Sequence, residues 1–86
     1  MTSLTHDAII SALLPWLGSI IHNKSIKLDA QTPLIAQNLI DSMDLLQMVT
    51  WAETTYGISI DPDSMTPENF ETPQKFAELL IATQAG

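Results

Sequence analysis

The chain has 86 residues, ten acidic side chains against three lysines for a formal net charge of -7, and no cysteine. This length allows one small domain, residues 1-86, because so short a chain buries only about 60% of the surface that it exposes when unfolded. The acidic balance argues against binding to nucleic acid or to an anionic membrane, which both need clustered Lys and Arg, and a chain without cysteine has neither disulfides nor thiolate metal sites.

The N-terminal segment carries no basic residue ahead of its apolar ones, and Pro15 and Gly18 interrupt the apolar stretch that follows. Neither a signal peptide nor a membrane span is therefore expected. We expect a cytoplasmic protein that is a monomer.

The first predicted element is an amphipathic helix from Thr5 to about Ile21. Its apolar residues recur at spacings of three and four, as in Ile9, Leu13, Trp16 and Ile20. Thr5 is the expected N-cap. Because Pro15 has no N–H to donate to Ser11, we expect the helix to kink or break there, and the two halves could be separate helices.

Residues 23–40 are predicted to form a long loop. Polar residues and proline surround isolated apolar residues that would hold the loop to the core, namely Ile26, Leu28, Leu34, Ile35 and Leu39. Loops of this length usually serve a function.

A second helix is predicted from Ser42 to Tyr56, ended by Gly57, which can take a left-handed cap conformation. At about 100° per residue, one narrow sector of this helix forms the core face, with Leu46 at its edge. The sector holds Leu45, Met48, Val49, Ala52 and Tyr56. Met43 and Trp51 project from the other side. Two interpretations stay open. In the first, Trp51 packs beneath the loop and Met43 closes the start of the helix; in the second, both residues form a surface that binds a partner.

Two proline-containing motifs predict the remaining helices. Thr66-Pro67 opens at most one turn, and Thr72-Pro73 opens a longer helix. One side of that helix carries Phe76, Leu79, Leu80 and Thr83. The extended residues 58–60 are too few to make a sheet. The fold class is therefore all-α, with three principal helices, one short helix and a long loop between the first two long helices.

Catalytic and metal chemistry is not expected. His6 and His22 lie at opposite ends of the first helical segment, with no nucleophile nearby in sequence. The segment from Asp61 to Ser64 could begin a calcium-binding loop, but such a loop needs an oxygen ligand at its fifth position and glycine at its sixth, where Met65 and Thr66 stand. The acids of this segment are therefore expected to face solvent and a partner.

Ser42 is the main candidate for chemistry. Serine is a preferred N-cap residue, so capping of the second helix is the simpler interpretation of the residue alone. Asp41 can serve as the cap instead. Ser42 then projects from the first helical turn, where N–H groups and the positive end of the helix dipole would stabilise a phosphodiester.

Three motifs surround this serine in a characteristic order. They are Thr32-Pro33-Leu34, Asp41-Ser42-Met43, and a helix that ends in Tyr56-Gly57-Ile58. With the chain length, the acidity and the Thr72-Pro73 helix start, they resemble the phosphopantetheine-dependent carriers of the acyl and peptidyl carrier protein family. The resemblance covers about Leu28 to Leu80.

Two details are similar to one branch of that family, the D-alanyl carrier proteins. The run from Asn38 to Met43 resembles their G-L-L-D-S-M, and the run from Glu71 to Phe76 resembles their D-T-P-x-K-I. The second helix is also poor in acids, which favours an aminoacyl or peptidyl carrier over a fatty-acid carrier. Asn38 replaces the family's glycine, and asparagine tolerates a positive φ.

The resemblance implies a non-catalytic carrier with 4'-phosphopantetheine covalently bound to Ser42 and with Asp41 as the motif residue at the helix start. It also implies three partners: a phosphopantetheinyl transferase, an ATP-dependent aminoacyl or acyl ligase, and a downstream acyl-acceptor enzyme. The candidate partner-binding residues are Met43, Asp44, Gln47, Trp51, Met65 and Phe70. Seven of the ten acids lie between residues 41 and 71, which favours basic partners.

The alternative is an acidic helical adaptor that is not a carrier. Such a protein would bind a partner through Met43 and Trp51 without any prosthetic group.

Overall fold

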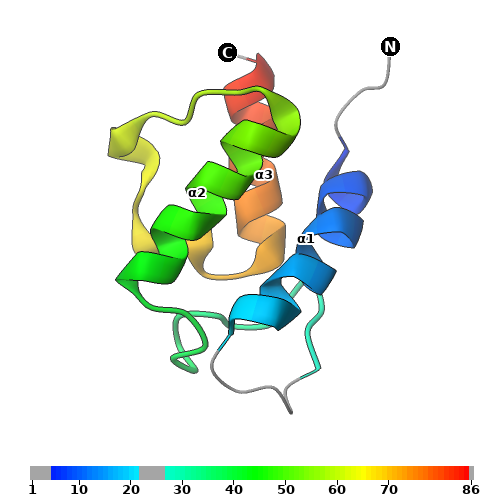
Figure 1. The fold of residues 1–86 in the computed structure, drawn as a ribbon, viewed down its shortest axis with the longest axis vertical. Coiled ribbons are helices and arrows are strands. Elements are labelled where there is room, and N and C mark those ends of the chain that lie inside the picture. The colour runs from blue at the N-terminus through cyan, green and yellow to red at the C-terminus, as the bar shows by residue number, and fades with distance from the viewer. Residues whose placement is uncertain (1–4, 22–26, 86) are drawn as a thin grey trace.

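The computed structural model describes residues 5–21 and 27–85 of the chain. Three long helices, α1 (His6–Ile20), α2 (Ser42–Tyr56) and α3 (Pro73–Ala85), pack into one bundle, as Figure 1 shows. Two 3₁₀ turns, η1 (Pro62–Ser64) and η2 (Pro67–Phe70), lie between α2 and α3. The predicted all-α fold with three principal helices is confirmed, and η1 is an additional turn that the sequence did not predict.

Helix α1 begins where the sequence predicts. The Thr5 hydroxyl accepts a hydrogen bond from the Ala8 N–H at 3.1 Å and so caps the first turn. Ile9, Leu13 and Leu17 form its buried stripe.

The break expected at Pro15 does not occur, because α1 continues through this residue as one helix. Pro15 is exposed, so its ring displaces nothing in the core. Leu13 and Leu17 are fully buried on either side of it. Burial of this stripe holds both halves of the helix in place despite the lost hydrogen bond.

The connection from α1 to α2 crosses the end of the bundle where α1 ends and α2 begins (Figure 1). Its described part, residues 27–40, is tied to the end of η2 and to α3. The Leu34 N–H donates to the carbonyl of Glu71, which follows η2, at 2.8 Å, and the Gln74 N–H of α3 donates to the Ala30 carbonyl at 3.0 Å. Of its predicted apolar anchors, Leu34 and Leu39 are buried, Leu28 and Ile35 are half-buried, and Ile26 lies outside the described residues.

Asn38 gives this connection its last turn before α2. Its φ of 54° lies in the left-handed region, where asparagine is better tolerated than other residues with a side chain. The expectation that Asn38 can stand for glycine at this turn is confirmed. Leu39 and Ile40, which follow it, are buried and anchor the entry to α2.

The core lies where the three helices and η2 meet. Phe70 and Phe76 have ring centroids 5.2 Å apart, and both are fully buried. Met48 of α2 and Leu80 of α3 are also fully buried. The predicted stripe of α3 is thereby confirmed, with Thr72 as its cap, since its hydroxyl accepts from the Lys75 N–H at 3.1 Å.

The segment between α2 and α3 is extended at first and then forms the two 3₁₀ turns. The Ile60 N–H donates to the Glu53 carboxylate at 2.8 Å, which ties the segment to α2. Asp61 accepts from the Asp63 N–H at 2.9 Å and caps η1. Thr66 stands at the N-cap of η2, but its side chain makes no capping hydrogen bond, so the prediction that Thr66 caps this turn through its hydroxyl is wrong.

None of the helices in residues 5–21 and 27–85 is long and apolar enough to cross a membrane.

Two glycines are expected to respond in opposite ways to a methyl group. Gly18 lies inside α1 with room for a Cβ, so Gly18→Ala should raise the free energy of unfolding by about 0.5–1 kcal/mol. Gly57 also has room, but its φ of +65° strains any residue with a Cβ, so Gly57→Ala should lower that free energy by about 1 kcal/mol. Urea denaturation of both variants measures the change in the free energy of unfolding. Equal changes in the two variants would contradict the left-handed cap of α2 at Gly57.

Candidate functional site

The start of α2 is fixed by two reciprocal hydrogen bonds. The Asp44 N–H donates to the Asp41 carboxylate at 3.0 Å, and the Asp41 N–H donates to the Asp44 carboxylate at 3.1 Å. This arrangement is a capping box, with aspartate in both positions. Asp41 is therefore the N-cap. The sequence left open whether Ser42 or Asp41 caps α2, and the interpretation with Asp41 as the cap is confirmed.

Ser42 is consequently the first residue inside the helix. It is exposed, and its hydroxyl makes no hydrogen bond with any described residue. The first N–H groups of a helix have no carbonyl within the helix to bind, and the positive end of the dipole lies there. A hydroxyl at this place is accessible to solvent, and the helix dipole and the remaining N–H groups of the first turn favour an anionic group there.

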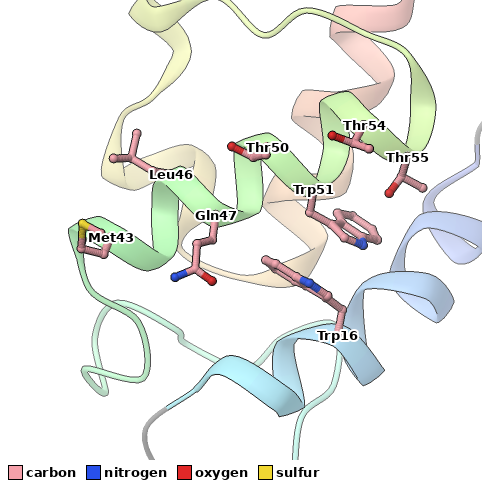
Figure 2. Close-up of a pocket in the computed structure, with 8 residues that line it drawn as sticks. All are labelled: Trp16, Met43, Leu46, Gln47, Thr50, Trp51, Thr54 and Thr55. Carbon is pink, nitrogen blue, oxygen red and sulfur yellow. The ribbon is translucent and has the colours of Figure 1, made fainter.

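A groove of about 450 Å³ runs along α2 and reaches Trp16 of α1, and Figure 2 shows its lining. Met43, the residue after Ser42, stands at one end of it, and Trp51 and Trp16 form its wall toward α1. The other lining residues, all from α2, are Leu46, Gln47, Thr50, Thr54 and Thr55. None of the lining residues is charged, although the chain carries a net charge of -7.

The exposed apolar residues of the described chain gather in this groove. Met43 is 65% exposed and Leu46 53% exposed, and these are its two large exposed hydrophobic residues. The sequence placed Leu46 at the edge of the core face, and this expectation is wrong. The helix turns Leu46 beyond the part of α2 that neighbouring elements cover, whereas Met48, Val49 and Ala52 of the predicted core face are buried as expected.

Two tryptophans join α1 to α2 at the groove. The rings of Trp16 and Trp51 are stacked, with centroids 5.4 Å apart and an interplanar angle of 22°. Tyr56 meets Trp51 edge-on at 5.7 Å. Trp51 thus packs against α1 rather than beneath the loop, and it is half-buried, so part of it also lines the groove.

Burial next to this cluster raises the pKa of Tyr56 above its usual value of 10.0, because loss of water disfavours the phenolate. The neutral phenol is therefore the form that fits the folded protein. Its contribution to stability is fully present below the unfolded value and is lost as the pH rises through the higher folded value.

The predicted partner-binding residues do not all reach the surface. Met43, Gln47 and Trp51 line the groove, whereas Met65 is half-buried elsewhere. Phe70 is fully buried against Phe76, and Asp44 is only 5% exposed because its carboxylate belongs to the capping box. These two residues are corrected from surface contacts to structural ones.

Five groove residues were not among the predicted site residues, namely Trp16, Leu46, Thr50, Thr54 and Thr55. Trp16 was assigned to the apolar face of the first helix and Leu46 to the edge of the core face. A signal for Trp16 was present, since a large aromatic residue at the flank of an apolar stripe often meets a second one on the neighbouring helix.

The acids after α2 lie mostly on the surface, as predicted. Asp61, Asp63, Glu68 and Glu71 are exposed, whereas Glu53, inside α2, is half-buried and accepts the Ile60 N–H. Within residues 5–21 and 27–85, no three histidine or carboxylate side chains come together as a set of metal ligands.

Comparison with known proteins finds no match among family models, curated proteins or solved structures. Function is therefore inferred from the residues and their geometry. The site combines an exposed serine at a helix start with an adjoining uncharged groove.

The capping role of Asp41 gives a stability prediction. Asp41→Ala removes the acceptor for the Asp44 N–H and should lower the free energy of unfolding by about 1 kcal/mol. Asp41→Asn keeps an oxygen acceptor and should retain most of that energy. Urea denaturation checks both, and an Asn variant as unstable as the Ala variant would contradict the hydrogen-bonded cap.

The tryptophan stack predicts energetic coupling between α1 and α2. In a double-mutant cycle of Trp16→Ala and Trp51→Ala, the two changes should be non-additive by about 1 kcal/mol, because removing either ring removes the same contact. Thermal or urea unfolding of the three variants measures this coupling. Additive losses would mean that the two rings do not stabilise each other.

Proposed function

We propose that the chain is a carrier that holds an aminoacyl or acyl group as a thioester on a 4'-phosphopantetheine arm attached to Ser42. The observation that carries this proposal is the capping of α2 by Asp41 and Asp44, which leaves the Ser42 hydroxyl exposed and without a described hydrogen-bond partner. A serine that capped its own helix would have its hydroxyl engaged. The resemblance of the Asp41-Ser42-Met43 segment to carrier motifs adds to it.

The residues at the start of α2 fit such an arm. A phosphodiester on Ser42 would sit beside the first N–H groups of a helix of 15 residues, where the dipole favours negative charge. Asp41 holds this turn in shape. The cysteine-free chain has no thiol of its own, and the arm, when bound, supplies the thiol that forms the thioester.

Attachment of the arm is a phosphoryl transfer in which Ser42 is the substrate. The Ser42 Oγ forms a bond to the phosphorus that carries pantetheine in coenzyme A, and the pyrophosphate P–O bond breaks to release adenosine 3',5'-bisphosphate. The hydroxyl proton goes to a base of the transferase, which also holds most of the magnesium coordination. The step involves no change of oxidation state.

Three partners follow from this function: a phosphopantetheinyl transferase, an ATP-dependent aminoacyl or acyl ligase, and an acyl-acceptor enzyme. The exposed acids Asp61, Asp63, Glu68 and Glu71 would attract basic surfaces on these enzymes. A flexible tether raises the effective concentration of the carried group at each of them. The chain itself would then need no catalytic residue.

A second candidate function is favoured by the exposure of Met43 and Leu46. An adaptor without a prosthetic group could bind a partner protein through the same two side chains. This candidate predicts that Ser42 stays unmodified, so one measurement separates the two functions.

Purified protein incubated with coenzyme A, magnesium and a broad-specificity phosphopantetheinyl transferase should gain the mass of one phosphopantetheine. The reason is the accessible hydroxyl of Ser42. Intact mass spectrometry with peptide mapping checks the mass and the site.

Ser42→Ala should gain no mass, whereas Ser59→Ala, at an exposed serine outside α2, should be modified like the original chain. Modification at another residue, or no modification of protein shown to be folded, would contradict the assignment of the arm to Ser42. The absence of any modification would favour the adaptor without a prosthetic group.

A further inference from the structure

The wall of the groove toward α1 is carried by one half of that helix. Among the described residues that line the groove, Trp16 alone comes from α1, and Figure 2 shows its indole reaching toward Trp51. Trp16 directly follows Pro15 in the chain. We infer that residues 16–21, the gate segment, open as a unit while the rest of the bundle stays folded, and that this opening removes the Trp16 wall from the groove. The inference does not depend on whether Ser42 carries an arm.

Pro15 separates the gate segment from the first half of α1. A proline inside a helix removes one backbone hydrogen bond, and its ring crowds the carbonyl four residues earlier, here that of Ser11. The helix passes through Pro15 without a break, but its two halves share fewer backbone hydrogen bonds than the halves of an uninterrupted helix would. The two halves can therefore open separately at a lower cost in free energy.

The gate segment has little helical stability of its own. Gly18 loses more backbone freedom on helix formation than any other residue type would. The Ser19 hydroxyl donates to the Trp16 carbonyl at 2.6 Å, a bond by which serine competes with the helical backbone. The helix ends at Ile21 without a left-handed cap and without a basic residue in its last turn. The first half, in contrast, begins at the hydrogen-bonded cap of Thr5.

Side-chain contacts therefore hold the gate segment in place. Leu17 is fully buried and Ile21 nearly so, and the Trp16 ring stacks on the Trp51 ring with centroids 5.4 Å apart. A segment held by a few side chains rather than by its own backbone opens at a lower free energy than the whole bundle. The first half of α1 has fully buried side chains of its own, so it stays packed when the gate segment opens.

Opening of the gate segment changes the groove and leaves the start of α2 intact. The face of the Trp51 ring that Trp16 covers becomes exposed, which extends the apolar part of the groove toward α1. The two capping hydrogen bonds between Asp41 and Asp44 involve no residue of α1, so Ser42 keeps its place. The gate segment therefore controls how much aromatic surface the groove offers.

Native-state hydrogen exchange of the full chain, followed by two-dimensional amide NMR, measures the opening of each part. The backbone amides of residues 17–21 should have protection factors about tenfold lower than those of Phe76 and Leu80, which lie in the core. They should also be less protected than the amides of Leu13 and Leu14, which lie in the first half of the same helix.

Two glycine variants form a matched pair for this test. Gly18→Ala should slow the exchange of residues 17–21 about two- to fivefold, because alanine favours the helical form of the gate segment. Gly57→Ala strains the cap of α2 and lowers the stability of the whole bundle. It should therefore speed the exchange of Phe76 and Leu80 about fivefold and leave that of residues 17–21 unchanged.

A second pair of variants tests whether the opening breaks the tryptophan stack. Trp51→Leu keeps an apolar side chain on α2 but removes the ring on which Trp16 lies, so it should speed the exchange of residues 17–21 about threefold. Thr50→Ala changes an exposed groove residue that has no part in the stack, and it should leave that exchange unchanged.

Two results would overturn the inference. If residues 17–21 are as protected as Phe76 and Leu80, or if Gly57→Ala speeds both sets alike, α1 opens only together with the whole bundle. If residues 17–21 exchange early but Trp51→Leu does not speed them, the helix end frays without releasing Trp16 and the groove has no gate. Neither result bears on the attachment of an arm to Ser42, which mass spectrometry tests separately.

Discussion

The pair of hydrogen bonds between Asp41 and Asp44 determines the geometry of the candidate site. They fix the residue at which α2 begins, and they satisfy the cap with carboxylates rather than with the neighbouring hydroxyl. Ser42 is thereby exposed at the first turn, and Met43 becomes the first residue of the groove. A cap supplied by Ser42 itself would engage the hydroxyl on which the proposed function depends.

The second constraint is the contact between α1 and α2. The stack of Trp16 on Trp51 ties two helices that are separated by a long connection, and it gives the groove its wall toward α1. The face of α2 that the bundle leaves uncovered lies beside that wall and carries Leu46. Ser42 and most of the residues that line the groove therefore belong to one helix.

Much of the fold was predictable because it depends on local chemistry. The left-handed cap at Gly57 and the turn at Asn38 each follow from the conformational preference of one residue. The start of the helix at Ser42 was also predicted, but the sequence left open whether Ser42 or Asp41 caps it. The rest depends on how the helices pack, which periodicity alone does not determine. Leu46 lies at the edge of an apolar sector, so its exposure depends on how far the neighbouring elements extend over α2. Pro15 lies in a segment with an apolar stripe, so whether the helix breaks there depends on how firmly that stripe packs against the rest of the bundle.

The central claim is that Ser42 carries a covalent arm, and protein isolated from its own cells tests it most directly. Intact mass spectrometry, with fragmentation to place the modification, should find a fraction of the chains heavier by one phosphopantetheine attached at Ser42. A population that consists only of unmodified chains, while coenzyme A and a transferase are present in those cells, would contradict the claim and favour an adaptor without a prosthetic group.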